Sequence, residues 1–186
     1  MRPLPGMRVV VPADAAETKL AIRAAVETDG PFYIRLGRPK VPVIFEDSCP
    51  FQLGKGYRLT EGEDLAIFAC GVMLYQALEA EKNLRREGVK AQVINMPTIK
   101  PIDTQIIIEA AKATGAVVTA EEHQVTGGLG SAVSEVLAEN FPVPLERVGI
   151  KDRFGESGTP EELFKKYGLT ARDIEEAAKK VLRRKG

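Results

Sequence analysis

The chain has 186 residues, enough for one large domain or two small ones, and its 44% hydrophobic and 28% charged residues are typical of a globular protein. Lysine plus arginine and aspartate plus glutamate are equal at 26 each, so no net charge attracts the chain to nucleic acid or to an anionic membrane. Two cysteines and one histidine give no disulfide framework and little material for a zinc site, and no apolar run approaches the roughly 20 residues that span a bilayer, so we expect a cytoplasmic protein.

The beginning of the chain predicts a β-α-β unit. Short apolar runs at 7–11 and 32–36 are typical of strands, and small and apolar residues recur at helical spacing between them. Asp14 stands at the N-cap position, and the turn after Thr28 ends the helix with glycine and proline. The next stretch, 37–64, is rich in proline and glycine, so we expect a linker there, with at most one short hairpin, and a domain boundary.

Strands and helices alternate again after residue 64. Strands are predicted at 65–71, 90–96, 115–122 and 145–150, and helices over 72–88, over 104–113, up to about residue 140 and in two C-terminal segments. Pro97 and Pro101 frame a predicted loop, while Thr159 and Thr170 each begin a capping box that starts a helix. The pattern predicts an α/β fold with a mostly parallel sheet and right-handed crossovers.

The stretch "TAEEHQVTGGLGSAVSEVL" (119–137) holds the single histidine, His123, and a glycine-rich turn between a strand and a helix. Gly127, Gly128 and Gly130 lie where open α/β sheets bind phosphate, but the spacing is neither GxGxxG nor a P-loop, and close helix–strand packing is the alternative. His123 follows the strand and is either a proton shuttle or a hydrogen-bonded structural or interface residue.

Four charged residues complete the candidate set. Glu121 and Glu122 are adjacent, so in a continuing strand they point to opposite faces and cannot act as a carboxylate pair. Arg35 and Arg38, in "YIRLGRP", lie at and just past the end of a strand. They are either a phosphate-binding pair, since a guanidinium offers a fork of donors, or surface residues with buried stems.

Three blocks of the sequence resemble the C-terminal part of transketolases, in the thiamine-diphosphate enzyme superfamily. They are "MRVVVPADAAETKLAIRAAVETDGPFYIRLGR", "TAEEHQVTGGLGSAVSEVL" and "GIKDRFGESGTPEELFKKYGLTARDIEEAAKKVL". The resemblance implies that residues 1–40 are the end of a pyrimidine-binding domain, 41–60 a linker and 61–186 a transketolase C-terminal-like domain with a three-layer, mostly parallel-sheet α/β fold. It also implies that Arg38, and less directly Arg35, contact the sugar phosphate.

The resemblance further implies a complete enzyme that transfers a two-carbon ketol unit between sugar phosphates, with thiamine diphosphate and a divalent metal, Mg or Ca. The family's diphosphate motif and its cofactor-activating glutamate do not occur in this sequence. We therefore expect no catalytic, cofactor-binding or metal-binding residue in this chain, and an inactive chain when it is alone. In that setting Glu121, Glu122, His123, Gly127, Gly128 and Gly130 are expected to be interface or structural residues.

The expected partners are sugar phosphates and either a second copy, in a homodimer, or the N-terminal half of a split enzyme, without nucleic acid or membrane. Two alternatives stay open. The chain is part of a related enzyme, a 1-deoxy-xylulose-5-phosphate synthase or a 2-oxo-acid dehydrogenase beta subunit, or it is a non-catalytic assembly module.

Overall fold

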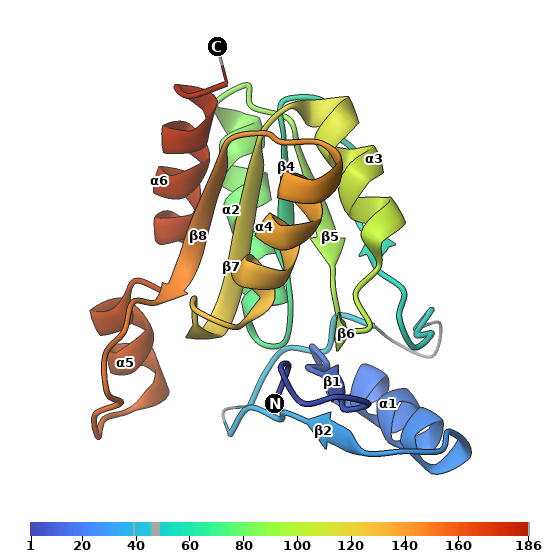
Figure 1. Cartoon of the computed structure of the whole chain (residues 1–186). Helices are drawn as coiled ribbons and strands as arrows, with labels where there is room; N and C mark the ends of the chain where they lie inside the picture. Colours follow the sequence, from blue (N-terminus) through green and yellow to red (C-terminus); the bar gives the residue numbers. More distant parts are fainter. Residues whose placement is uncertain (39, 46–48, 186) are drawn as a thin grey trace.

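The computed structural model describes residues 1–38, 40–45 and 49–185. Its larger part is a five-stranded sheet with the order β3-β5-β4-β7-β8 (Figure 1). The strands are β3 (Tyr57–Arg58), β4 (Leu65–Ala69), β5 (Ala91–Asn95), β7 (Val117–Gln124) and β8 (Leu145–Ile150). All neighbours pair in parallel except β3, which runs antiparallel to β5. The predicted mostly parallel α/β sheet is therefore confirmed.

Helices cover both faces of this sheet. The helices are α2 (Met73–Arg86), α3 (Thr104–Thr114), α4 (Leu129–Asn140), α5 (Pro160–Tyr167) and α6 (Ala171–Leu182). One core lies under α2 and α6 and the other under α3 and α4. The side chains of β4 point alternately into the two cores: Ile67 lies in the core under α2 and α6, and Phe68 lies in the core under α3 and α4. This two-sided burial explains why its sequence is apolar throughout.

A second, smaller sheet lies at the carboxyl ends of the parallel strands (Figure 1). It contains β1 (Arg8–Val10) and β2 (Phe32–Ile34), which pair in parallel and are connected by α1 (Ala15–Glu27), as the sequence predicts. Its third strand is β6 (Thr98–Lys100), antiparallel to β1. The predicted loop between Pro97 and Pro101 is thus wrong, because these residues pair with a strand about 90 positions earlier in the chain.

The predicted hairpin in the linker is also absent from the described residues of 37–64. Instead, β3 adds to the edge of the large sheet, and Phe45 is buried in the core under α2 and α6. Residues 46–48 of this stretch lie outside the described residues. The predicted capping boxes at Thr159 and Thr170 are confirmed, with both reciprocal hydrogen bonds in place.

Helix α5 stands apart from the sheet beyond the end of β8, and no residue of it is buried (Figure 1). The loop before it exposes Phe154 almost completely, at 97%. The chain then returns to the sheet through Leu169, which is buried, and α6 packs along α2. In the described ranges, no helix is long and apolar enough to cross a bilayer.

Candidate functional site

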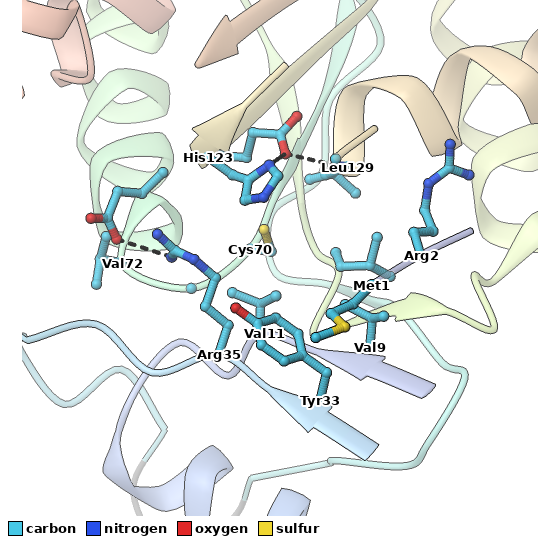
Figure 2. Close-up of a pocket in the computed structure, with 15 residues that line it drawn as sticks. Met1, Arg2, Val9, Val11, Tyr33, Arg35, Cys70, Val72, His123 and Leu129 are labelled. Carbon is cyan, nitrogen blue, oxygen red and sulfur yellow. Dashed lines mark hydrogen bonds and ion pairs between the residues drawn. The ribbon is translucent and has the colours of Figure 1, made fainter. Parts of the chain in front are cut away.

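A cavity lies where the small sheet meets the carboxyl ends of the large one (Figure 2). Its walls come from the N-terminal residues, β1, β2, the turn after β4, the end of β7 and the start of α4. The side chains in it that can carry charge or react include Arg2, Arg35, Cys70, Glu121, Glu122 and His123. Most of the candidate residues are therefore brought to one place, at the end of the sheet where α/β folds bind ligands.

Arg35 follows β2 directly, and its backbone amide donates to the carbonyl oxygen of Val10, which extends the pairing with β1. Its guanidinium lies 3.2 Å from a carboxylate oxygen of Glu122 (Figure 2). Both side chains are about three-quarters covered, with exposures of 28% and 29%. The pair connects the small sheet to the large one, and it neutralises one of the two candidate anion-binding arginines.

Arg38 is exposed and does not line the cavity that contains Arg35. It borders a separate groove together with Glu122, the loop 155–158 and one side of α5. Among the described residues, Arg38 has no ion-pair partner. Its side chain borders the groove, and Glu122 is the residue that borders both spaces.

The glycine-rich turn leads into α4, and backbone amides at the start of this helix bind a carboxylate of the same chain. The buried Glu121 accepts hydrogen bonds from the backbone amides of Leu129, at 2.7 Å, and Gly130, at 2.8 Å. These are the free amides that would bind a phosphate. Because a β-carbon on Gly128 would collide with the Glu121 carboxylate, the glycine permits this close approach. Burial raises the pKa of Glu121, while the hydrogen bonds from the two amides oppose the shift.

Glu121 and Glu122 have different partners, the first at α4 and the second at β2, so they do not form a carboxylate pair, as the sequence predicts. His123 is about half exposed, and its Nδ1 contacts the backbone carbonyl oxygen of Gln124 at 2.8 Å. Cys70, in the same cavity, is fully buried, and burial raises the pKa of its thiol well above the usual value. The cavity therefore offers no activated nucleophile beside a base.

Sequence analysis did not predict a buried polar cluster where the first turn of α1 meets the end of β5. Asp14, the N-cap of α1, accepts from the amides of Glu17, Ile44 and Phe45. The fully buried Glu17 accepts from the amide of Ala13 and from the side-chain nitrogen of Asn95, both at 2.7 Å. Burial raises the pKa of Glu17 to about 7. Only the spacing of Asp14 and Glu17, an N-cap with an acid at the third helical position, pointed to this cluster.

Within the described ranges, no three His, Cys, Asp or Glu side chains gather in a group that could hold a metal ion. The amides at the start of α4, the best-placed anion donors, are taken by Glu121. The residues present therefore do not fit a metal-bound diphosphate, and no reaction step can be assigned to such a group in this chain.

The fold and the site define an α/β protein with a five-stranded, mostly parallel sheet and a smaller three-stranded sheet at the carboxyl ends of its strands. Comparison with known families agrees. Residues 54–174 match the model of the transketolase C-terminal domain, and residues 1–43 match that of the transketolase pyrimidine-binding domain. The chain belongs to the transketolase family.

Individual relatives give the same result. The chain is 47% identical over 185 residues to a 6-deoxy-6-sulfo-D-fructose transketolase subunit of Clostridium sp. (strain MSTE9), and the match covers 100% of this chain and 58% of that one. It is 42% identical over 175 residues to an apulose-4-phosphate transketolase subunit of Phocaeicola vulgatus, covering 94% and 56%. A split-gene transketolase solved as an inactive beta4 tetramer superposes with a TM-score of 0.97 at 54% identity, covering 100% and 61%. The chain spans somewhat more than half of each.

Proposed function

We propose that this chain supplies the end of the pyrimidine-binding domain and the C-terminal domain of a split transketolase. In this proposal the pyrimidine-binding domain ends with residues 1–40, the linker is 41–60, and the C-terminal domain is 61–186. The complete enzyme moves a two-carbon ketol unit between sugar phosphates, and a partner subunit carries the diphosphate-binding part. The relatives from Clostridium and Phocaeicola, which are both named as transketolase subunits, support the split arrangement.

The observation that carries the proposal is the open edge of the small sheet. β2 lies at its edge and pairs on one side only, with β1. Around it, apolar side chains face solvent: Val26 of α1 is 83% exposed, and Ile22 and Leu36 are about half exposed. An open edge with an apolar rim requires further strands and helices to cover it. The rest of a pyrimidine-binding domain has the chemistry to do so.

In the complete enzyme, thiamine diphosphate would supply the carbanion chemistry of ketol transfer, and a divalent metal would anchor its diphosphate. The residues of this chain hold the substrate and the assembly together. Arg38 binds the anionic group of the sugar from the groove beside α5, since a guanidinium donates several hydrogen bonds to one phosphate. Arg35 takes part through its ion pair with Glu122. Glu121, His123 and the glycine turn keep structural or interface roles.

The test starts from the native protein. The complex is isolated from its source cells with an antibody to this chain, and the intact masses of its polypeptides are measured. Ketol transfer from xylulose 5-phosphate to ribose 5-phosphate is then assayed with added thiamine diphosphate and Mg²⁺. Transfer would support the proposal. Activity with pyruvate and no transfer from any sugar phosphate would replace it with a related thiamine-diphosphate enzyme, and no activity of either kind would favour an assembly module.

A further inference from the structure

Glu122 lies between two spaces, so its position gives it a second possible role besides the ion pair with Arg35. Its side chain borders both the cavity that contains Arg35 and the groove that contains Arg38. The two arginines are three residues apart, so their α-carbons lie within about 11 Å of each other. One carboxylate from the large sheet thus borders the space of each arginine, and among the described residues its ion-pair partner is Arg35, at 3.2 Å.

The other charged groups at the Arg38 groove do not alter this balance. Glu156 also borders the groove, but it pairs with Lys166 at 2.6 Å. Glu121 faces the amides of α4, and His123 borders only the neighbouring cavity. Among the described residues, Arg38 is the cation that borders this groove, whereas Arg35 lines the neighbouring cavity and is paired with Glu122. Without the Glu122 carboxylate, which borders both spaces, the Arg35 guanidinium would be a second, unpaired charge beside the groove.

We propose that Glu122 is a selectivity residue: by holding Arg35, it limits the positive charge offered to the anionic group of the sugar and so reduces the preference for doubly over singly charged groups. This inference rests on the proposed substrate-binding role of Arg38. A dianion gains from a second adjacent guanidinium much more than a monoanion does, because the Coulomb term scales with the product of the charges. Removal of the carboxylate charge should therefore change affinity for the two classes unequally.

The experiment uses the full chain labelled with ¹⁵N-arginine and follows the side-chain Nε–H signal of Arg38 by NMR. Two probes are titrated at pH 8 and at ionic strength held constant with chloride: inorganic phosphate, mainly a dianion, and methanesulfonate, a monoanion. Glu122→Gln keeps the shape of the side chain and removes its charge. The matched control is Glu176→Gln, which removes the same charge from an Arg172–Glu176 pair on α6.

For Glu122→Gln we expect roughly five- to tenfold tighter phosphate binding, the scale of one added charge-assisted contact. Methanesulfonate, with half the charge, should gain about half that free energy, which is about two- to threefold in affinity. Glu176→Gln should leave both affinities as in the wild type. If Arg38 responds to phosphate in the wild type and Glu122→Gln has the same affinity and selectivity, Glu122 has no such role. If Arg38 responds to no anion in any variant, the proposed phosphate site fails, and the role of Glu122 fails with it.

Two further variants test the inference separately from the single variant Glu122→Gln. Arg35→Ala leaves the Glu122 charge unpaired beside the groove, so phosphate affinity at Arg38 should fall several-fold. The double variant Arg35→Ala/Glu122→Gln removes both charges and should return phosphate affinity to near the wild-type value. A double variant that binds phosphate as tightly as Glu122→Gln alone would contradict the inference, because the gain would then not come from Arg35.

Discussion

The side-chain nitrogen of Asn95 donates a hydrogen bond of 2.7 Å to Glu17, and this contact connects the end of β5 to the first turn of α1 across 78 positions of the chain. Both residues are fully buried, and the other side-chain atom of Asn95, Oδ1, has no hydrogen-bond partner in the described structure. A buried carboxylate next to an unpaired amide oxygen is stabilised by protonation, because the protonated acid can donate a hydrogen bond.

Glu17 should therefore make stability depend on pH. Burial raises its folded-state pKa from 4.5 to about 7, so the folded protein binds a proton that the unfolded chain releases. The stabilising contribution is complete below pH 4.5 and is lost as the pH rises to about 7. Glu17→Gln should remove up to about 3 kcal/mol of that pH dependence. Urea unfolding of both proteins at pH 5.5 and pH 8 measures it; parallel pH profiles would contradict the assignment.

Gly128→Ala should weaken the start of α4. A β-carbon at this position would collide with the Glu121 carboxylate and displace it from the amides of Leu129 and Gly130. Two buried amides would lose their acceptor, which costs about 2–4 kcal/mol of unfolding free energy. Gly155→Ala is the control, since nothing lies within 4 Å of a β-carbon there. Equal unfolding midpoints for the two variants in urea would show that the carboxylate does not cap the helix.

Arg38→Ala in the complete enzyme should raise the Michaelis constant for phosphorylated substrates. One lost charged hydrogen bond corresponds to roughly 1–3 kcal/mol of binding free energy. Steady-state kinetics with several sugar phosphates measure the change, and Arg172→Ala on α6, where the side chain pairs only with Glu176 among the described residues, is the control. An unchanged Michaelis constant for every phosphorylated substrate would remove Arg38 from the substrate site.

His123→Ala should affect assembly more than turnover. The ring is about half exposed; its Nδ1 contacts the backbone carbonyl oxygen of Gln124 and lies 3.9 Å from the Glu121 carboxylate. Among the described residues that line the cavity, we identify no activated nucleophile that could use His123 as a base. We expect turnover per assembled site within about threefold of the wild type, well below the 10²–10⁴-fold that a general base contributes. Sedimentation together with turnover at saturating substrate separates the two effects. A large loss of turnover in an intact assembly would make His123 a proton shuttle.

Val26→Asp should behave differently in this chain alone and in the proposed complete enzyme. In the present chain Val26 is 83% exposed, so the substitution should change the unfolding free energy by no more than about 0.5 kcal/mol. In the complete enzyme a covered Val26 would force a carboxylate into an apolar contact and destabilise the assembly. Phe154→Asp, at a side chain that is 97% exposed on the arm before α5, is the matched control. Identical behaviour of the two variants in the complete enzyme would mean that α1 is not covered.

Local signals predicted most of the fold. The capping boxes fixed the starts of α5 and α6, and the apolar run of β4 showed that both its faces are covered. Strands β3 and β6 were not predicted, because each has only two or three residues and pairs with a distant partner. The proline residues around β6 made it look like a loop.

For the site, too, the sequence pointed to single residues but not to the contacts between distant parts of the chain. Arg35, Arg38, Glu122 and His123 stood out from their places at strand ends. The contact between Arg35 and Glu122, however, spans 87 positions and follows only from the way the two sheets meet. The burial of Glu17 was likewise invisible in a helix whose other acids and bases face solvent, because its partner is contributed by β5. Tertiary contact decided which of the charged residues act together.

Strand β6 also has a consequence for synthesis on the ribosome. The small sheet begins with β1 at Arg8, yet its third strand is not available until Lys100 has been made. Because chains grow at about 5–20 residues per second, β1 waits several seconds for this partner. During that time one edge of β1 has no strand beside it, and an unpaired edge is a template on which another chain can add. Translation of the residues between β1 and β6 is therefore an interval in which the small sheet is open to mispairing.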